Sequence, residues 1–146
     1  MNLLFVCTGN TCRSPMAEAI FNHLCSVRNL EHESFSRGLN VIIPQPVSSK
    51  SIEALKNKNI ELNKTFSQQL TYEDVKKADL VLTMTSGHKM TLKSVFPDCK
   101  DKIYTLNEKA YSKDSDIADP YGGQQEVYDE CCEEITGAVE KLLCVI

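Results

Sequence analysis

The stretch LLFVCTGNTCRSPMAEAI, residues 3–20, decides the fold of this chain. Its first four residues are all apolar, which is typical of a short strand buried on both faces of a parallel sheet. Ser14 and Pro15 then predict the start of a helix, because serine suits the N-cap and proline suits the first helical position. The connection between strand and helix, CTGNTCR, holds two cysteines, a glycine, an asparagine and an arginine. A loop that only joins two elements needs none of these.

Strand and helix patterns alternate along the rest of the chain. Apolar runs predict strands at 80–84 and 103–106, and Phe35 lies in a further strand before Gly38. Helices are expected at 48–59, 71–77, 86–95 and 124–143, with two prolines marking a loop at 39–47 and a polar stretch at 109–123. The expected core face of the last helix consists of Val127, Cys131, Ile135, Val139 and Leu142. The alternation predicts an α/β fold with a parallel sheet covered by helices on both faces.

Composition narrows the class of protein. The 146 residues fit a single domain, 1–146. The net charge of −4 argues against nucleic acid as a partner, because duplex binding needs a basic face. No apolar run reaches the ~18 residues that cross a bilayer, and the N-terminus lacks a signal-peptide pattern, so a cytoplasmic protein without a membrane partner is expected. Seven cysteines are then expected to be free thiols, and their spacing predicts no metal site.

The CTGNTCR loop has the composition of an anion-binding site. Ligands of open parallel sheets bind outside the carboxyl ends of the strands, where this loop begins. Gly9 takes positive φ freely and Asn10 tolerates it, so the backbone amides can converge on one point. The following helix directs its N-terminus to the same place, and Arg13 can clamp two phosphate oxygens. We therefore expect the loop to bind phosphate.

The positive electrostatic potential of these groups also acts on Cys7, the first cysteine of the loop. Inward amides, a helix N-terminus and a guanidinium favour the thiolate of Cys7, which would then attack phosphorus and form a phosphocysteine that water hydrolyses. Ser14 could donate its hydroxyl to this thiolate and assist its departure. Its hydroxyl could instead serve only as the N-cap, and the two roles compete for one group.

A second sequence motif, Asp119-Pro120-Tyr121, could supply a general acid. Asp119 lies in the polar stretch before the last helix, where it could protonate a leaving group. Pro120 would stiffen Asp119, and Tyr121 could form a wall of the pocket. Taken alone, the Asp-Pro pair favours an ordinary turn over a general acid.

Together, CTGNTCRSP at 7–15 and Asp119-Pro120-Tyr121 resemble the low-molecular-weight protein tyrosine phosphatase family. The resemblance covers nearly the whole chain, including Ser36-x-Gly38 and the segments 78–84 and 101–106. It implies a four-stranded parallel sheet of the flavodoxin-like, low-molecular-weight phosphatase fold, phosphorylated proteins as substrates, and no cofactor. It also implies Cys7 as nucleophile, Arg13 as phosphate clamp and Asp119 as general acid. The phosphate-binding loop would comprise Thr8, Gly9, Asn10, Thr11, Cys12 and Ser14, with Asn10, Ser14 and Ser36 holding its shape.

The substrate question depends on Thr11. Tyrosine-directed members usually have an aliphatic residue there, and threonine resembles the bacterial protein-arginine phosphatase branch. A hydroxyl could bond a guanidinium nitrogen or orient the attacking water. Val41, Ile42 and Ile43 also stand where tyrosine-directed members often place an aromatic, so the pocket would hold a phenyl ring less well. Phosphoarginine is the expected substrate, and phosphotyrosine remains the alternative if Thr11 is a neutral variant.

Other interpretations stay open. Cys12 could form a redox-sensitive disulfide with Cys7, or simply pack the loop. An arsenate reductase would need a cysteine pair where this chain has only Cys99. A non-catalytic phosphoprotein-binding module would need neither a nucleophile nor an acid. Arg37 could meet acidic protein surfaces, and His88 is expected on a helix surface.

Of the adjacent Cys131 and Cys132, one is expected in the core and one on the surface, since consecutive helical residues face different directions.

Overall fold

A four-stranded parallel sheet runs through the centre of the computed structural model, which describes residues 1–146. The strands are β1 (Asn2–Cys7), β2 (Glu33–Gly38), β3 (Leu80–Thr83) and β4 (Ile103–Thr105), in the spatial order β2-β1-β3-β4. β1 pairs with both β2 and β3, so Cys7 lies beside Gly38, and Val6 lies beside Thr83. The predicted four-stranded parallel sheet is confirmed.

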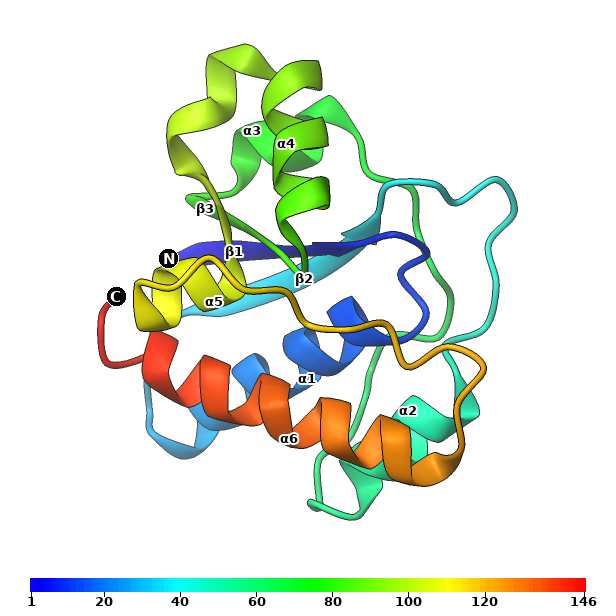
Figure 1. Ribbon diagram of the computed structural model, residues 1–146. Helices are drawn as coiled ribbons and strands as arrows, with labels where there is room; N and C mark the ends of the chain where they lie inside the picture. The colour runs from blue at the N-terminus through cyan, green and yellow to red at the C-terminus, as the bar shows by residue number, and fades with distance from the viewer.

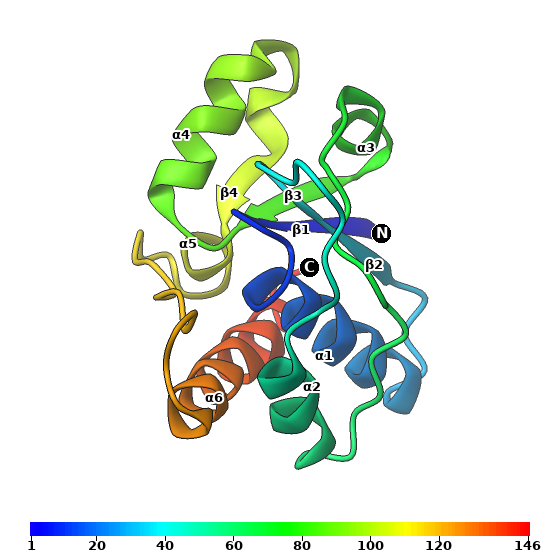
Figure 2. The same cartoon turned by 90° about the vertical axis from the view of Figure 1, so that its right-hand side faces the viewer.

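Helices cover both faces of this sheet, as Figures 1 and 2 show. One face carries α1 (Arg13–Val27), α2 (Ser49–Lys56), α5 (Leu106–Tyr111) and α6 (Gln125–Leu142). The other carries α3 (Tyr72–Lys77), α4 (Ser86–Val95) and the short 3-10 helix η1 (Pro97–Lys102). No helix is long and apolar enough to cross a membrane.

Alternate side chains of β1 point to the two faces of the sheet and so belong to two different hydrophobic clusters. Leu3 and Phe5 belong to a cluster of 24 buried residues on the α1 and α6 side. Leu4 and Val6 belong to a cluster of eight on the α3 and α4 side. Successive strand side chains point to opposite faces, so one all-apolar strand serves both clusters.

The ends of several elements differ from the prediction. The first helix begins at Arg13 with Cys12 as its N-cap, so Ser14 already lies inside the helix. The polar stretch at 109–123 was expected to lack regular structure, but α5 extends to Tyr111. A capping box explains this helix, because Thr105 and Glu108 satisfy each other's backbone amides, and this local signal is readable in the sequence.

The predicted packing of the last helix is partly wrong. Val127 is exposed, whereas its neighbour Tyr128 is buried, so the buried face of α6 begins at Tyr128 rather than at Val127. Cys131 and Cys132 are both buried, so the expected division into one core and one surface cysteine is wrong. α6 packs against α1, α2 and α5, and three neighbouring helices cover a wider arc of its surface than a single neighbour would.

The strand order places a candidate ligand site at the carboxyl ends of the strands. The chain moves from β1 outward to β2, and β3 lies on the other side of β1, so the strand order reverses there. A crevice forms at such a switch point outside the carboxyl ends of the strands. The loop between β1 and α1 lies at this place (Figure 2).

Candidate active site

A cavity of about 210 Å³ opens at the carboxyl end of β1. Two segments far apart in the sequence line it, the loop between β1 and α1 and the turn before α6. Its lining residues are Cys7, Thr8, Gly9, Thr11, Cys12, Arg13, Asp119 and Tyr121. The structure therefore brings together the two sequence motifs that were expected to form one site.

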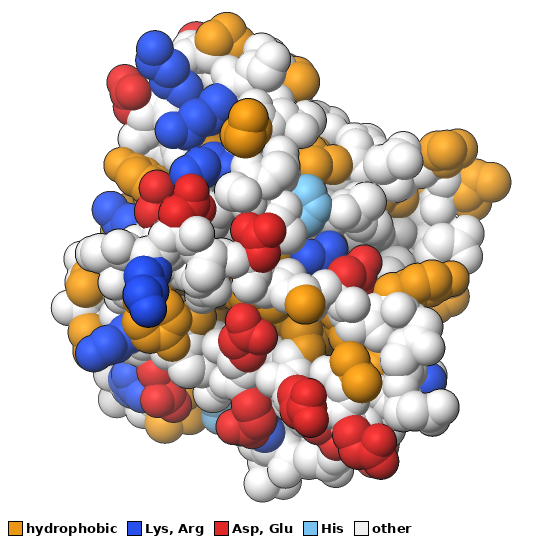
Figure 3. All heavy atoms as spheres, in the orientation of Figure 1, with side chains coloured by type: hydrophobic (Ala, Val, Ile, Leu, Met, Phe, Trp, Pro, Cys, Tyr) orange, Lys and Arg blue, Asp and Glu red, His pale blue; other side chains and the backbone are white.

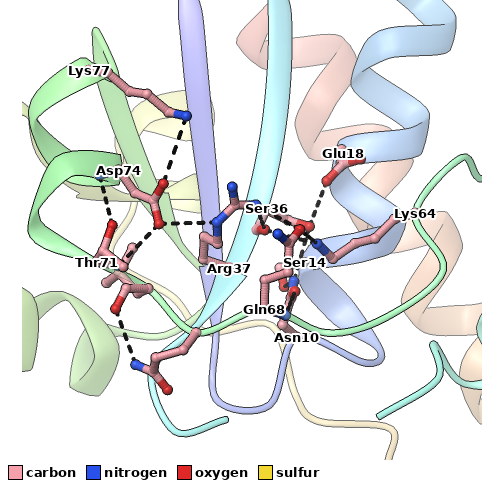
Figure 4. Close-up of polar contacts among 12 residues, drawn as sticks. Asn10, Ser14, Glu18, Ser36, Arg37, Lys64, Gln68, Thr71, Asp74 and Lys77 are labelled. Atoms are coloured by element: carbon pink, nitrogen blue, oxygen red, sulfur yellow. Dashed lines mark hydrogen bonds and ion pairs between the residues drawn. The ribbon is translucent and has the colours of Figure 1, made fainter. Parts of the chain in front are cut away.

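Asn10 determines the course of the loop. It has a φ of 56°, whereas Gly9 keeps a negative φ, so the left-handed turn falls on the asparagine rather than on the glycine. The fully buried Asn10 amide donates to the hydroxyls of Ser14 (2.8 Å) and Ser36 (3.0 Å), and its Oδ1 accepts from the backbone amide of Gln68 (3.0 Å). One side chain thus connects the loop to α1, β2 and the segment before α3 (Figure 4).

The sulfur of Cys7 lies among hydrogen-bond donors. Its Sγ is 2.9 Å from Ser14 Oγ and 3.3 Å from the amide nitrogen of Asn10. Ser14 accepts from Asn10 Nδ2, so the proton of its hydroxyl is available to the sulfur. Helix α1 has no side-chain N-cap bond. Of the two roles open for Ser14, the geometry supports the contact with Cys7.

Arg13 faces the cavity from a fixed position. It is 4% exposed, its Nη1 donates to the Ile117 carbonyl at 2.9 Å, and its buried Nε has no protein partner. Its Nη2 is 3.6 Å from Asp119 Oδ2. The guanidinium keeps donor capacity for an anion in the cavity, and an unpaired buried donor is costly unless a ligand satisfies it.

Asp119 lies beside Arg13 in a more open setting. Its side chain is 51% exposed, and its Oδ1 accepts from the backbone amide of Tyr121 at 3.1 Å. Tyr121 itself is 80% exposed and stands at the rim. The carboxyl can therefore reach a group that protrudes from the cavity.

The end of β2 supports the loop from behind. Ser36 donates to Glu18 Oε1 at 2.7 Å while accepting from Asn10. A Cβ on Gly38 would lie 2.6 Å from Val41 Cγ2 and 2.9 Å from the Thr8 carbonyl, so only glycine allows this close approach. The Ser36-x-Gly38 pattern thus combines a hydrogen bond with a backbone contact.

Arg37 forms polar contacts within its own chain, and a contact with acidic protein surfaces stays a prediction. Its Nε pairs with Asp74 Oδ2 at 3.0 Å, and the two side chains are 15% and 10% exposed. Its Nη1 donates to the Ser36 carbonyl and to Gln68 Oε1. Lys64 Nζ also donates to Gln68 Oε1, at 2.8 Å, and burial lowers the pKa of Lys64. Figure 4 shows these side chains converging behind the loop.

His88 forms a contact that the sequence did not predict. Its Nε2 lies 2.8 Å from Thr8 Oγ1, whereas a helix-surface position was expected. Burial, together with the Arg13 charge, lowers the pKa of His88 to about 4. Figure 3 shows a hollow in this face of the molecule in which a histidine lies near basic and acidic side chains. The only local signal was the N-cap Thr85, which places His88 in the first turn of α4 but says nothing of its partner.

Cys12 is buried, and its sulfur lies 3.6 Å from the hydroxyl of Tyr128 and 3.7 Å from that of Thr11. Cys7 and Cys12 are both free thiols, and the disulfide between them stays a prediction. Thr11 lines the cavity and also a wider groove beside it, which Ile42 and Ile43 border.

Comparison with known proteins decides the family. Residues 2–146 match the model of the low molecular weight phosphotyrosine protein phosphatases. The chain belongs to this family. The phosphatase is 39% identical over 142 residues to a protein-arginine-phosphatase of Bacillus subtilis, covering 97% of this chain and 94% of the relative. It is also 39% identical to a low molecular weight protein-tyrosine-phosphatase of Staphylococcus aureus, over 100% and 99% of the two chains.

A solved structure agrees in fold with this phosphatase. It is an arginine phosphatase in which serine replaces the active-site cysteine and carries a phosphoryl group. The TM-score is 0.93 at 38% identity, covering 97% of this chain and 93% of the other. The predicted family and low-molecular-weight phosphatase fold are confirmed.

Proposed function

We propose that this phosphatase hydrolyses phosphoarginine residues of proteins through a phosphocysteine at Cys7. The position of the Cys7 sulfur carries the proposal, at 2.9 Å from Ser14 Oγ and 3.3 Å from the Asn10 amide, in a cavity that Arg13 also faces. Donors to a sulfur favour its anionic form, which is the nucleophilic one. The solved relative with a phosphorylated serine at its active site supports covalent transfer.

The first step follows from this geometry. The Cys7 thiolate attacks phosphorus, an S–P bond forms, and the bond from phosphorus to the leaving nitrogen breaks. Arg13 and the loop amides bind the phosphoryl oxygens. Asp119, which lines the cavity beside Arg13 and is half exposed, gives its proton to the leaving nitrogen.

Hydrolysis of the intermediate uses the same residues in reverse. Water attacks phosphorus while the Asp119 carboxylate takes a proton from it, and the S–P bond breaks to release inorganic phosphate. The Ser14 hydroxyl stabilises the departing thiolate, since it already lies within hydrogen-bond distance of Sγ.

Thr11 supports phosphoarginine over phosphotyrosine. Its side chain lines the catalytic cavity, and its Oγ1 has only a long contact of 3.7 Å to Cys12 Sγ, so the hydroxyl is available to a guanidinium. Across from Tyr121, the neighbouring groove has Val41, Ile42 and Ile43 in place of an aromatic wall. A phenyl ring would stack on one side only.

Two weaker functions lack support in the geometry. Cys99 lies in η1 and borders a separate hollow with Tyr72 and Asp98, so it is not placed to relay a disulfide to Cys7 as an arsenate reductase requires. A binding module would need neither Cys7 nor Asp119, yet both line the cavity. We also propose a reducing, cytoplasmic setting, which the seven free cysteines support.

The first experiment tests catalysis itself. Wild type should hydrolyse p-nitrophenyl phosphate, and Cys7→Ser should lose this activity by a factor of about 10³ or more, because a hydroxyl is not ionised at neutral pH. Cys144→Ser is a matched control, since Cys144 is exposed at the C-terminus. Equal rates for wild type and Cys7→Ser would remove the enzymatic proposal.

The second experiment tests the substrate. Peptides carrying phosphoarginine or phosphotyrosine are compared with wild type and Thr11→Ile. We expect wild type to prefer phosphoarginine and the variant to shift towards phosphotyrosine, because isoleucine removes the hydroxyl and adds apolar contact. An unchanged preference in Thr11→Ile would contradict the role of Thr11, and a wild-type preference for phosphotyrosine would favour the alternative substrate.

A further inference from the structure

We propose that His88 is a positioning residue for substrate specificity, holding the Thr8 hydroxyl at the rim of the cavity, where it meets the phosphoguanidine of the substrate. The inference rests on the proposed function and extends it. Thr8 is exposed and lines the cavity directly after Cys7. Its Oγ1 has one side-chain partner, His88 Nε2 at 2.8 Å.

The imidazole is anchored independently of the loop that it contacts. The backbone amide of His88 donates to Thr85 Oγ1 at 3.1 Å, which fixes the first turn of α4. The amide of Ser86 donates to Asp116 Oδ1 at 2.8 Å, and Lys89 pairs with Glu108 at 3.2 Å and with Asp114 at 3.5 Å. These bonds hold α4 against the segment that carries Asp119. His88 therefore has a fixed position from which it can orient the Thr8 hydroxyl.

The charge state of His88 suits this role. The groups that act on it are Arg13, which lowers its pKa, and Asp116 and Asp119, which raise it by less than burial and Arg13 lower it. With a pKa of about 4, the imidazole is neutral at physiological pH. It adds no charge beside a bound phosphate.

The surroundings of the other ring nitrogen determine the direction of the hydrogen bond between His88 and Thr8. His88 Nδ1 is buried without a partner. A bare acceptor is tolerated there better than an orphaned N–H, so the proton lies on Nε2 and is donated to Thr8 Oγ1. Thr8 keeps its own proton and a second lone pair.

A hydroxyl in this state can donate and accept at once. The phosphoguanidine group places phosphoryl oxygens, which accept, next to guanidinium N–H groups, which donate. Thr8 can bond both, whereas an aryl phosphate offers it only the oxygens. Loss of a hydrogen bond to a charged group lowers the rate about tenfold or more, which is enough to set a preference.

Four variants test this pair: His88→Ala, His88→Gln, Thr8→Val and the double variant His88→Ala/Thr8→Val. With a phosphoarginine peptide, we expect His88→Ala and Thr8→Val each to lower kcat/KM about tenfold, mostly through KM, and the double variant to lose no more. With p-nitrophenyl phosphate, His88→Ala should lose no more than about threefold, because the Thr8 hydroxyl remains and only has to donate to the phosphoryl oxygens. Thr8→Val, which removes that donor, should lose activity on both substrates but more on phosphoarginine. His88→Gln should recover most of the activity on phosphoarginine, since its amide can donate to Thr8.

Several results would overturn the inference. These are equal losses on the two substrates, additive losses in the double variant, or a glutamine variant no better than alanine. If His88→Ala fails to fold in circular dichroism, Thr8→Val and His88→Gln carry the same comparison. Wild type that hydrolyses p-nitrophenyl phosphate but not phosphoarginine would instead overturn the proposed substrate, and this inference with it.

Discussion

At the scale of the residue, Asn10 shows how one side chain can organise a site. The left-handed backbone at φ 56° turns the loop, and the amide then joins Ser14, Ser36 and Gln68. Asparagine tolerates this conformation better than most residues, and its amide both donates and accepts. Glycine could make the same turn but could not hold the three partners.

The acid role proposed for Asp119 predicts a dependence on the leaving group. Asp119→Asn should slow the release of poor leaving groups by about 10²–10³, because they need a proton as the bond breaks. Good leaving groups such as p-nitrophenolate should lose less than about tenfold. Steady-state rates on a series of aryl phosphates measure this, with Asp101→Asn, at an exposed position away from the cavity, as control. A uniform loss across the series would deny Asp119 the acid role.

His88 predicts a dependence of stability on pH. Its pKa in the folded state is about 4, below the ordinary value of 6.5, so the unfolded chain binds a proton that the folded chain excludes. The stability that comes from keeping His88 neutral is fully present above about pH 6.5 and is lost as the pH falls towards 4. Between pH 7 and 5, the urea midpoint of wild type should therefore fall more than that of His88→Gln. Parallel curves for the two proteins would rule out this contribution.

At the scale of the element, the link between β2 and α3 illustrates a buried ion pair behind the site. Asp74 Oδ2 accepts from Arg37 Nε at 3.0 Å and from the backbone amide of Thr71 at 3.1 Å, which begins α3. The same carboxylate therefore caps a helix and pairs with a strand. It connects the end of β2, and through Gln68 the catalytic loop, to the opposite layer of helices.

This arrangement predicts an unequal response to the two cations around Asp74. Arg37→Ala should cost about 3 kcal/mol in the free energy of unfolding, because it leaves a buried carboxylate with one amide partner, that of Thr71, and an exposed lysine. Lys77→Ala, which removes a 56%-exposed cation 3.8 Å from Asp74, should cost less than about 1 kcal/mol. Urea unfolding measures both, and similar costs for the two variants would contradict the account.

At the scale of the whole molecule, the sheet couples the catalytic loop to both halves of the core. β1 contributes to the cluster of 24 residues and to the cluster of eight, and the loop continues directly from it. A ligand bound to the loop therefore stabilises the folded state as a whole rather than one layer.

Inorganic phosphate should accordingly raise the stability of the entire chain in a single transition. At a concentration of 100 times its Kd, the expected gain is about 2.7 kcal/mol, and it appears as a higher melting temperature. Arg13→Ala should abolish the shift, while Arg28→Ala, at an exposed position after α1, should retain it. Separate melting of two units, or an equal shift in Arg13→Ala, would contradict this prediction.

Much of the fold was open to prediction because its signals are local. The all-apolar strand at 3–6, the alternation of elements and the prolines needed no knowledge of distant contacts. Helix α5 was missed although its capping box is local, because a polar stretch was taken as a loop. Val127 and the Cys131–Cys132 pair were misplaced because helical periodicity alone does not tell how many neighbours a helix has.

The sequence by itself determined the four-stranded parallel sheet and the two motifs, because strand burial, loop composition and helix starts are written in neighbouring residues. Only the tertiary structure decided which distant groups meet: His88 with Thr8, Arg37 with Asp74, and Asn10 with Ser36 and Gln68. These pairs join residues 26 to 80 positions apart along the chain. Hydrogen bonds and ion pairs act only over a few ångströms, so such partners are set by how the layers pack and not by any pattern along the chain.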